Sequence, residues 1–303
     1  MATRDVVLIT GCSSGMGRVA AEFLARKKYR VFASLRGLES RNAQRARDLQ
    51  ALAERESLPL HVLELDITDD GSVDRAVDGI IKEVGRIDVL VNNAGVSVGG
   101  LTEAVTIEQA RRVLETNFLG VLRMNRAVLP GMRSHGSGLL IHISSLFGRI
   151  VAPGLGLYNA SKFALEALAE TYHYELAGEG IDSVIIEPGR YATSIGQNRD
   201  QASDIDRMSA YGPAGKIPET ILRGTGPARD PQEVADAVLR LIEMPAGSRP
   251  LRTPVGVPGD SLNNLNSVSE QAQEGFLNRL GLAALTKFRA RAASTDQPGV
   301  EGR

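Results

Sequence analysis

The chain has 303 residues, of which 43% are hydrophobic and 23% are charged. These values are typical of a globular protein with a large buried core, and they exclude general disorder. The 35 basic and 36 acidic residues give a net charge of −1. Proteins that grip nucleic-acid phosphates usually carry a basic surplus, so no nucleic-acid partner is expected.

Cysteine content and hydropathy indicate where the protein works. The single cysteine, Cys12, has no partner for an intramolecular disulfide, and no run of about eighteen apolar residues is present to span a bilayer. The segment Met1–Asp5 enters a short apolar run that glycine soon interrupts, which differs from a signal peptide. These features predict a cytoplasmic protein.

Short apolar runs alternate with longer helical patterns along the chain. The expected strands are Val6–Thr10, Arg30–Leu35, Leu60–Leu65, Val89–Asn92, Leu139–Ser144, Ser183–Glu187 and Leu251–Val255. The expected helices are Val19–Lys27, Arg41–Glu56, Ser72–Val84, Ile107–Arg133, Tyr158–Leu176 and Pro231–Met244. This alternation predicts right-handed crossovers and an α/β fold, a doubly wound Rossmann-type parallel sheet with helices on both faces. We expect one domain over residues 1–256.

Two segments depart from this alternation. Residues 194–229 are rich in Gly and Pro without a sustained period, which predicts a lobe that covers the substrate. The apolar residues of this lobe either line a substrate pocket or pack the lobe onto the rest of the domain. They are Ile205, Met208, Tyr211, Ile217, Ile221 and Leu222. Residues 257–303 form an extension with a polar stretch and then a helix near Phe276–Arg291. We expect this helix to dock on its own domain or on a partner subunit, in preference to a membrane surface.

A glycine-rich segment lies where the first strand meets the first helix. Its glycines let backbone amides approach a pyrophosphate at a helix N-terminus, although a tight turn alone also uses such residues. Cys12 is expected to be a small packing residue here. The candidate cofactor-binding residues of this segment are Gly11, Ser13, Ser14, Gly15, Met16 and Gly17.

The end of the second strand indicates which dinucleotide is bound. An NAD site usually places Asp or Glu there to accept a hydrogen bond from the ribose 2′-OH, but this chain has Arg36. A guanidinium offers planar donors to a 2′-phosphate. NADP(H) is therefore the expected cofactor. The alternative is that Arg36 opens a solvated basic helix with Arg41, Arg45 and Arg47.

Two further strand ends supply candidate cofactor contacts. Asp66, with Ile67 after it, is placed to lie beside the adenine, or else Asp66 caps the next helix. Asn93, Ala94 and Gly95 follow the fourth strand, where small residues permit close approach and Asn satisfies turn amides. Their role is structural or cofactor-binding. The four histidines lack paired ligand spacing, so no metal site is expected: His61, His135, His142 and His173.

Tyr158 and Lys162 are four residues apart on an expected helix, so their side chains share one face. A tyrosine pKa near 10 suits a base poorly at neutral pH, and a nearby ammonium is expected to lower it. Ser145 ends the fifth strand and can return to the same cleft, where its hydroxyl orients a substrate oxygen. Together with the glycine-rich turn, these three residues indicate catalysis.

At these residues the sequence resembles the short-chain dehydrogenase/reductase family, from about Val6 to Met244. The resemblance implies that Tyr158 is the general acid in carbonyl reduction, that Ser145 polarises the carbonyl and that Lys162 holds the nicotinamide ribose. It adds Asn117, which positions a water in the proton relay. It also implies that the loop after the sixth strand meets the nicotinamide and pyrophosphate through Pro188, Gly189, Tyr191 and Thr193, although Tyr191 departs from the expected small aliphatic residue.

Within the family, Gly11–Gly15 and Val31–Arg36 are most similar to the 17β-hydroxysteroid and retinol dehydrogenase branch. This similarity implies a small lipophilic ketone or secondary alcohol as substrate, and a homo-oligomer such as a dimer or tetramer. A non-catalytic NADP(H)-sensing or scaffold protein on the same fold is the alternative. The intact Ser145, Tyr158 and Lys162 argue against it.

Overall fold

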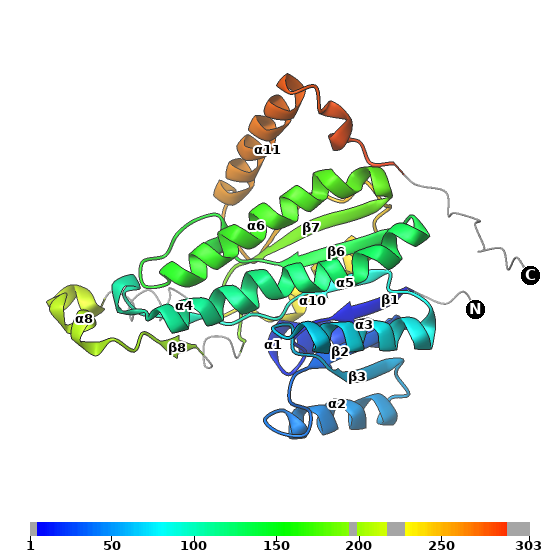
Figure 1. Ribbon diagram of the computed structural model, residues 1–303, viewed down its shortest axis with the longest axis horizontal. Coiled ribbons are helices and arrows are strands. Elements are labelled where there is room, and N and C mark those ends of the chain that lie inside the picture. Colours follow the sequence, from blue (N-terminus) through cyan, green and yellow to red (C-terminus); the bar gives the residue numbers. More distant parts are fainter. Residues whose placement is uncertain (1–4, 194–198, 217–227, 290–303) are drawn as a thin grey trace, which may run out of the picture.

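The computed structural model describes residues 5–193, 199–216 and 228–289. Within them, seven parallel strands form one sheet in the order β3-β2-β1-β4-β6-β7-β9 (Figure 1). The strands are β1 (Val6–Ile9), β2 (Arg30–Leu35), β3 (Leu60–Glu64), β4 (Val89–Asn92), β6 (Gly138–Ile143), β7 (Ile181–Pro188) and β9 (Arg252–Val255). The order reverses between β1 and β4, and ligands bind at such a switch point in doubly wound folds. The predicted Rossmann-type sheet is confirmed.

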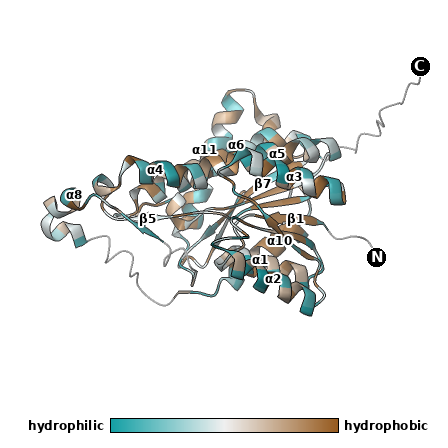
Figure 2. Ribbon diagram, turned by 60° about the horizontal axis from the view of Figure 1, so that its bottom comes forward, coloured by the Kyte–Doolittle hydropathy of each residue, from teal (hydrophilic) through white to brown (hydrophobic). Residues whose placement is uncertain are grey.

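Helices cover both faces of the sheet (Figures 1 and 2). One face carries α1 (Gly15–Arg26), α2 (Ala43–Arg55) and α10 (Gln232–Glu243). The other carries α3 (Asp70–Val84), α4 (Ile107–Leu114), α5 (Gly120–His135) and α6 (Gly156–Leu176). Short helical turns are η1 (Thr102–Ala104), η3 (Leu146–Gly148) and η4 (Ala177–Glu179).

The sheet divides the core into two apolar layers. In β1, Val7 and Ile9 belong to the layer beneath α1 and α10, whereas Val6 and Leu8 belong to the layer beneath α3 and α5. Because this strand is buried on both faces, successive residues in its sequence are apolar. Burying each such side chain stabilises the fold by about 1.5–3 kcal/mol.

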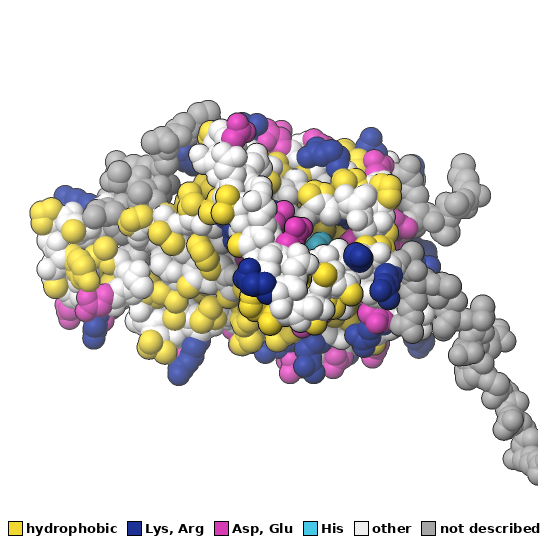
Figure 3. All heavy atoms as spheres, turned by 90° about the horizontal axis from the view of Figure 1, so that it is seen from above, with side chains coloured by type: hydrophobic (Ala, Val, Ile, Leu, Met, Phe, Trp, Pro, Cys, Tyr) yellow, Lys and Arg dark blue, Asp and Glu magenta, His cyan; other side chains and the backbone are white. Residues whose placement is uncertain are grey.

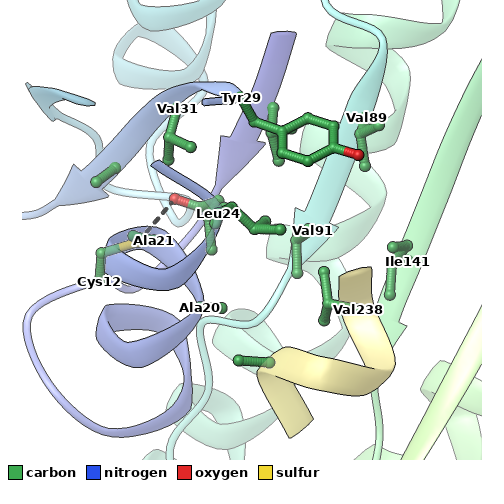
Figure 4. Packing of buried hydrophobic residues seen from close by; sticks show 14 of the residues in the cluster. Cys12, Ala20, Ala21, Leu24, Tyr29, Val31, Val89, Val91, Ile141 and Val238 are labelled. Carbon is green, nitrogen blue, oxygen red and sulfur yellow. Dashed lines mark hydrogen bonds between the residues drawn. The ribbon is translucent and has the colours of Figure 1, made fainter. Parts of the chain in front are cut away.

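Cys12 packs into the first of these layers (Figure 4). Its thiol donates to the carbonyl oxygen of Ile9 at 3.3 Å, and burial raises its pKa to about 12. The nucleophilic thiolate is thus suppressed. The prediction that Cys12 is a small packing residue is confirmed.

The helix expected over Ile107–Arg133 is observed as one helical run that contains a π-helical turn. Between α4 and α5, the residues Glu115–Leu119 form a π-helical turn, labelled η2. Such a turn inserts one extra residue and changes which side chains face the sheet. The expected helix is therefore confirmed, and the π-helical turn within it was not predicted, because the apolar pattern runs through the turn without a break.

The part of the substrate lobe that the structure describes projects from the body. Strand β8 (Asp200–Gln201) pairs in parallel with β5 (Val98–Gly99), and α8 (Ile205–Ala210) and the turn η5 (Gly212–Lys216) follow. Of the expected pocket residues, Ile205 and Tyr211 are exposed and Met208 is partly buried. Ile217, Ile221 and Leu222 lie outside the described residues.

The helix of the C-terminal extension lies earlier than predicted. Helix α11 spans Ser261–Arg279, through the stretch taken as polar and irregular, and the short turn η6 (Ala283–Thr286) follows. The expected span Phe276–Arg291 is wrong, because Gly281 takes the left-handed conformation and its amide bonds back to Asn278. A glycine in this conformation ends a helix.

Helix α11 contacts its own domain along a narrow line. Leu262 and Leu277 are buried, whereas Val268 is 65% and Phe276 48% exposed. Figure 3 views the protein from the side of α11 and shows hydrophobic side chains among the exposed ones. Among the described helices, none combines the length and the apolar character needed to cross a membrane.

Candidate active site

The glycine-rich turn is tied to the loop after β4. The side-chain amide of Asn93 donates to the carbonyl oxygens of Thr10 at 2.8 Å and Gly11 at 3.2 Å. A Cβ at Gly17 would overlap this amide and would lie 2.7 Å from the oxygen of Gly11. Gly11 itself has a φ of +74°. Glycine is therefore required at both positions, and the predicted cofactor residue Asn93 uses its side chain to hold the turn.

The N-terminus of α1 points out of this turn. Ser14 is its N-cap residue, and the first turn contains no acidic side chain. The first amides of a helix have no acceptor within the helix, so this end attracts an anion such as a pyrophosphate. Met16 packs partly against the core, so only its backbone faces the turn. Ser13 and Gly15 complete the turn, and Gly15 has a φ of +60°.

Arg36 lies in the loop after β2, seven residues before α2 begins, so it does not open a helix. This loop is held by Glu64, whose carboxylate accepts from the amides of Gly37 at 2.6 Å and Leu38 at 2.7 Å. The guanidinium of Arg36 lies 3.8 Å from the carboxylate of Asp66 and near the charge of Arg41. The structure thus places Arg36 and Asp66 together at the carboxyl edge of β2 and β3.

Asp66 and Ile67 follow β3. Asp66 accepts from the amide and the hydroxyl of Thr68, at 3.0 and 2.8 Å, and Asp69 caps helix α3. The alternative role for Asp66, as the cap of that helix, is therefore wrong. The side chain of Ile67 is buried against Gly120, so only its backbone is available to a ligand.

Ser145, Tyr158 and Lys162 come together at the carboxyl edge of the sheet. Ser145 follows β6, and its hydroxyl is hydrogen-bonded to the phenol of Tyr158, which lies in the first turn of α6. One turn later, the ammonium of Lys162 donates to the carbonyl oxygen of Ile143 at 2.8 Å and lies 5.9 Å from the centre of the Tyr158 ring. The predicted triad is assembled.

Burial controls the acidity of these groups. It raises the pKa of Tyr158, and the Ser145 hydrogen bond and the charge of Arg199 offset it only in part. Burial also lowers the pKa of Lys162 to about 8, against a smaller opposing effect of Glu166. The net shift of the Tyr158 pKa is therefore opposite to the one expected from Lys162, because desolvation outweighs the nearby charges. Tyr158 keeps its proton at neutral pH.

A family model described as short chain dehydrogenase matches residues 5–204. The chain belongs to the short-chain dehydrogenase family. It is 38% identical over 196 residues to 3-ketodihydrosphingosine reductase of Bacteroides thetaiotaomicron, covering 65% of this chain and 67% of that protein. It is 32% identical to retinol dehydrogenase 8 of Homo sapiens, covering 86% and 85%. The relation to the retinol dehydrogenase branch is thereby confirmed.

A solved short-chain dehydrogenase from Streptomyces avermitilis has the same fold. Its TM-score is 0.73 at 29% identity, with 93% of this chain and 98% of that chain covered. The family, the fold and the arrangement of Ser145, Tyr158 and Lys162 agree, and they establish an oxidoreductase of the short-chain dehydrogenase type.

Asn117 lies in the π-helical turn of this short-chain dehydrogenase. Its side chain is fully buried, accepts from the amide of Val96 at 2.8 Å and donates to the hydroxyl of Ser161 at 2.9 Å. Gly95 lies against it, since a Cβ there would meet the Asn117 oxygen at 3.3 Å and the Lys162 ammonium at 3.9 Å. The turn thus places Asn117 beside Lys162.

The loop after β7 lies at the same edge and contains Pro188, Gly189, Tyr191 and Thr193. Tyr191 points its side chain toward α10, where its hydroxyl donates to Glu233 at 2.9 Å. The large side chain that departs from the family pattern therefore packs against α10, while the amides of Gly189 and Ala192 bond to Val255 and Arg229.

Three residues that the sequence did not single out shape the site. Thr10 accepts from the amides of Asn93 and Ala94, both at 3.0 Å, and Glu64 holds the Arg36 loop. Arg199 lies near Tyr158. Only Thr10 carried a signal, because it belongs to the glycine-rich motif.

Proposed function

We propose that this short-chain dehydrogenase transfers a hydride between NADP(H) and a lipophilic ketone or secondary alcohol, with reduction as the favoured direction. The convergence of Ser145, Tyr158 and Lys162 beside the N-terminus of α1 is the observation that carries the proposal. The glycine-rich turn at the N-terminus of α1, held by the packing of Gly17 against Asn93, fits a dinucleotide pyrophosphate. Bound NADPH supplies the hydride.

Each residue of the triad has a distinct task in this proposal. Tyr158 donates a proton to the developing alkoxide, and its raised pKa keeps that proton available at neutral pH. Ser145 donates a hydrogen bond to the same substrate oxygen. Lys162, beside Asn117, holds the ribose of the cofactor and supplies positive charge as the phenolate forms.

The preference for NADP(H) rests on Arg36. The charge of Arg41 lies close to Arg36, and both belong to the loop that Glu64 holds. Two guanidinium groups favour the doubly charged 2′-phosphate, to which Arg36 presents several donors. Asp66 lies 3.8 Å from the guanidinium of Arg36 and is itself held by Thr68.

The lipophilic substrate is supported by the relatives. One reduces 3-ketodihydrosphingosine by name, and another is a retinol dehydrogenase. We also propose that the protein forms a homo-oligomer and that it is cytoplasmic, in keeping with the buried thiol of Cys12. Residues 1–256 form the catalytic domain in this proposal, and residues 257–303 form an extension.

A cofactor and substrate panel tests this proposal. Purified protein is given NADPH or NADH with retinal, a ketosteroid, an aryl ketone and a quinone, and alcohol formation is measured by mass spectrometry. We expect NADPH-dependent reduction of at least one lipophilic ketone. Tight NADPH binding without reduction or oxidation of any panel member would support the NADP(H)-sensing alternative and contradict the proposal.

A further inference from the structure

Arg199 presents a cation to the reaction centre from the substrate lobe. It precedes β8, whose first residue, Asp200, donates its amide to the carbonyl oxygen of Ser97 at 3.1 Å. Ser97 follows the Asn93–Gly95 loop, so the β5–β8 pair fixes the backbone of Arg199 beside the catalytic edge. The charge of Arg199 lowers the pKa of Tyr158, against a larger opposite effect of burial.

The guanidinium of Arg199 is only partly satisfied. Its Nε atom is buried and has no hydrogen-bond partner among the described residues. A buried donor without an acceptor is costly, and for a charged group the cost is larger. An acceptor that enters with a ligand removes this cost.

Three acidic side chains around the lobe are paired with other cations. Asp200 binds Arg112 at 2.7 Å, Asp204 binds Arg207 at 2.9 Å, and Glu103 binds Arg207 at 3.0 Å. Burial lowers the pKa of Arg199, and the ionised form of Tyr158 offsets part of that shift. The described part of the protein thus places a cation beside the phenol without giving it a carboxylate.

We propose that Arg199 binds a carboxylate carried by the substrate, close to the carbonyl that Tyr158 reduces. This inference rests on the proposed function, because Tyr158 marks the position of the reacting carbonyl. The substrate class is then an amphiphilic keto acid, with an apolar body and a carboxylate near the ketone. A planar guanidinium suits this task, since it can bind a carboxylate through two parallel hydrogen bonds.

Matched acids and esters test this assignment. Benzoylformate and benzoylpropionate, each beside its methyl ester, place the carboxylate at two spacings from the same aryl ketone. We expect the wild type to prefer one acid over its ester at least tenfold in kcat/KM. Arg199→Gln is expected to lower that ratio at least tenfold, and Arg199→Lys to restore part of it.

Arg207→Gln is the matched control, because Arg207 is an exposed arginine of the same lobe that pairs with Glu103 and Asp204. It should leave the acid-to-ester ratio within twofold of the wild type. An equal loss of acid and ester turnover in Arg199→Gln would overturn the inference, since a group that only supports Tyr158 acts on both substrates alike. A wild type without a preference for either acid would also overturn it.

Calorimetry with phenylbutyrate and phenylbutyramide, which contain no ketone, separates this inference from the proposed function. If the protein reduces no ketone but still binds phenylbutyrate in a way that depends on Arg199, the proposed function is contradicted and the anion site is supported. Ketone reduction without Arg199-dependent carboxylate recognition would contradict the anion site alone.

Discussion

The cofactor side and the substrate side of the sheet are stabilised by different kinds of contact. After β1 and β4, backbone atoms and small residues hold the two loops together: Gly17 packs against Asn93, and Thr10 is hydrogen-bonded to Asn93. On the substrate side, buried ion pairs hold β9 and α6 together. The guanidinium of Arg252 is 1% exposed and binds Glu166 at 2.9 Å and Glu170 at 2.6 Å.

This buried cluster continues to the C-terminal extension. Glu187 at the end of β7 lies 3.7 Å from Arg252 and accepts from Asn266 of α11 at 2.7 Å. Arg149 also bonds to Asn266, at 2.9 Å. The cofactor edge therefore depends on closely packed glycines and amides, whereas the substrate side depends on buried charged groups, and both bring distant parts of the chain together.

Gly17→Val should disturb the cofactor edge most. The added side chain overlaps the Asn93 amide, and overpacking of this kind costs roughly 1–3 kcal/mol or more. Because the turn must shift to relieve this overlap, NADPH binding measured by fluorescence should weaken roughly tenfold or more, equivalent to about 1.4 kcal/mol. Gly79→Val is the control, because a Cβ at Gly79 meets no atom within 4 Å. Equal binding in both variants would contradict the account of the glycine-rich turn.

Arg36→Asp should have the next largest effect. It replaces a cation by an anion beside Asp66, and a hydrogen bond between charged groups contributes about 1.5–3 kcal/mol. We expect NADPH affinity to fall roughly 10–100-fold more than NADH affinity. Arg47→Asp, in helix α2, where Arg47 bonds to Gln44, is the charge-matched control. A parallel loss for both cofactors would remove the basis for the NADP(H) preference.

Glu187→Gln should have a smaller effect that depends on pH. Burial, with a further contribution from Glu166, raises the pKa of Glu187 from 4.5 to about 7. The folded state therefore binds a proton that the unfolded state releases in this interval, and the resulting stability is lost as pH rises through about 7. The neutral variant lacks this term, which amounts to about 1–3 kcal/mol.

Thermal unfolding from about pH 5 to about pH 8 checks this expectation. The Tm of Glu187→Gln should rise relative to that of the wild type as the pH increases. A Tm difference that stays constant across this range would show that Glu187 is ionised throughout, held by Arg252 and Arg149.

The sequence predicted the cofactor edge well, because its residue types are recognisable in short motifs: the glycines Gly11, Gly15 and Gly17, and the four-residue spacing of Tyr158 and Lys162. The contacts that require these residues, such as that of Gly17 with Asn93, are long-range and are seen only in the fold. The π-helical turn at Asn117 left no such motif, since the apolar pattern continues through it.

The substrate side was predicted poorly for the complementary reason. Helix α11 buries few side chains, so it shows no clear apolar stripe, and its contact with Glu187 spans 79 residues of sequence. Arg199 is one arginine in a Gly-rich and Pro-rich lobe, and only the pairing of β5 with β8 brings it near Tyr158. Contacts of this kind can be predicted only once the fold is known.

Tyr158→Phe tests the central claim most directly, because it removes the transferable proton and keeps the ring. Wild type and variant are compared for NADPH Kd by fluorescence titration and for kcat on the best ketone of the panel. We predict a Kd within about twofold of the wild type and a kcat lower by about 10²–10⁴, the usual contribution of a general acid. A kcat close to that of the wild type would contradict the assignment of Tyr158 as the proton donor.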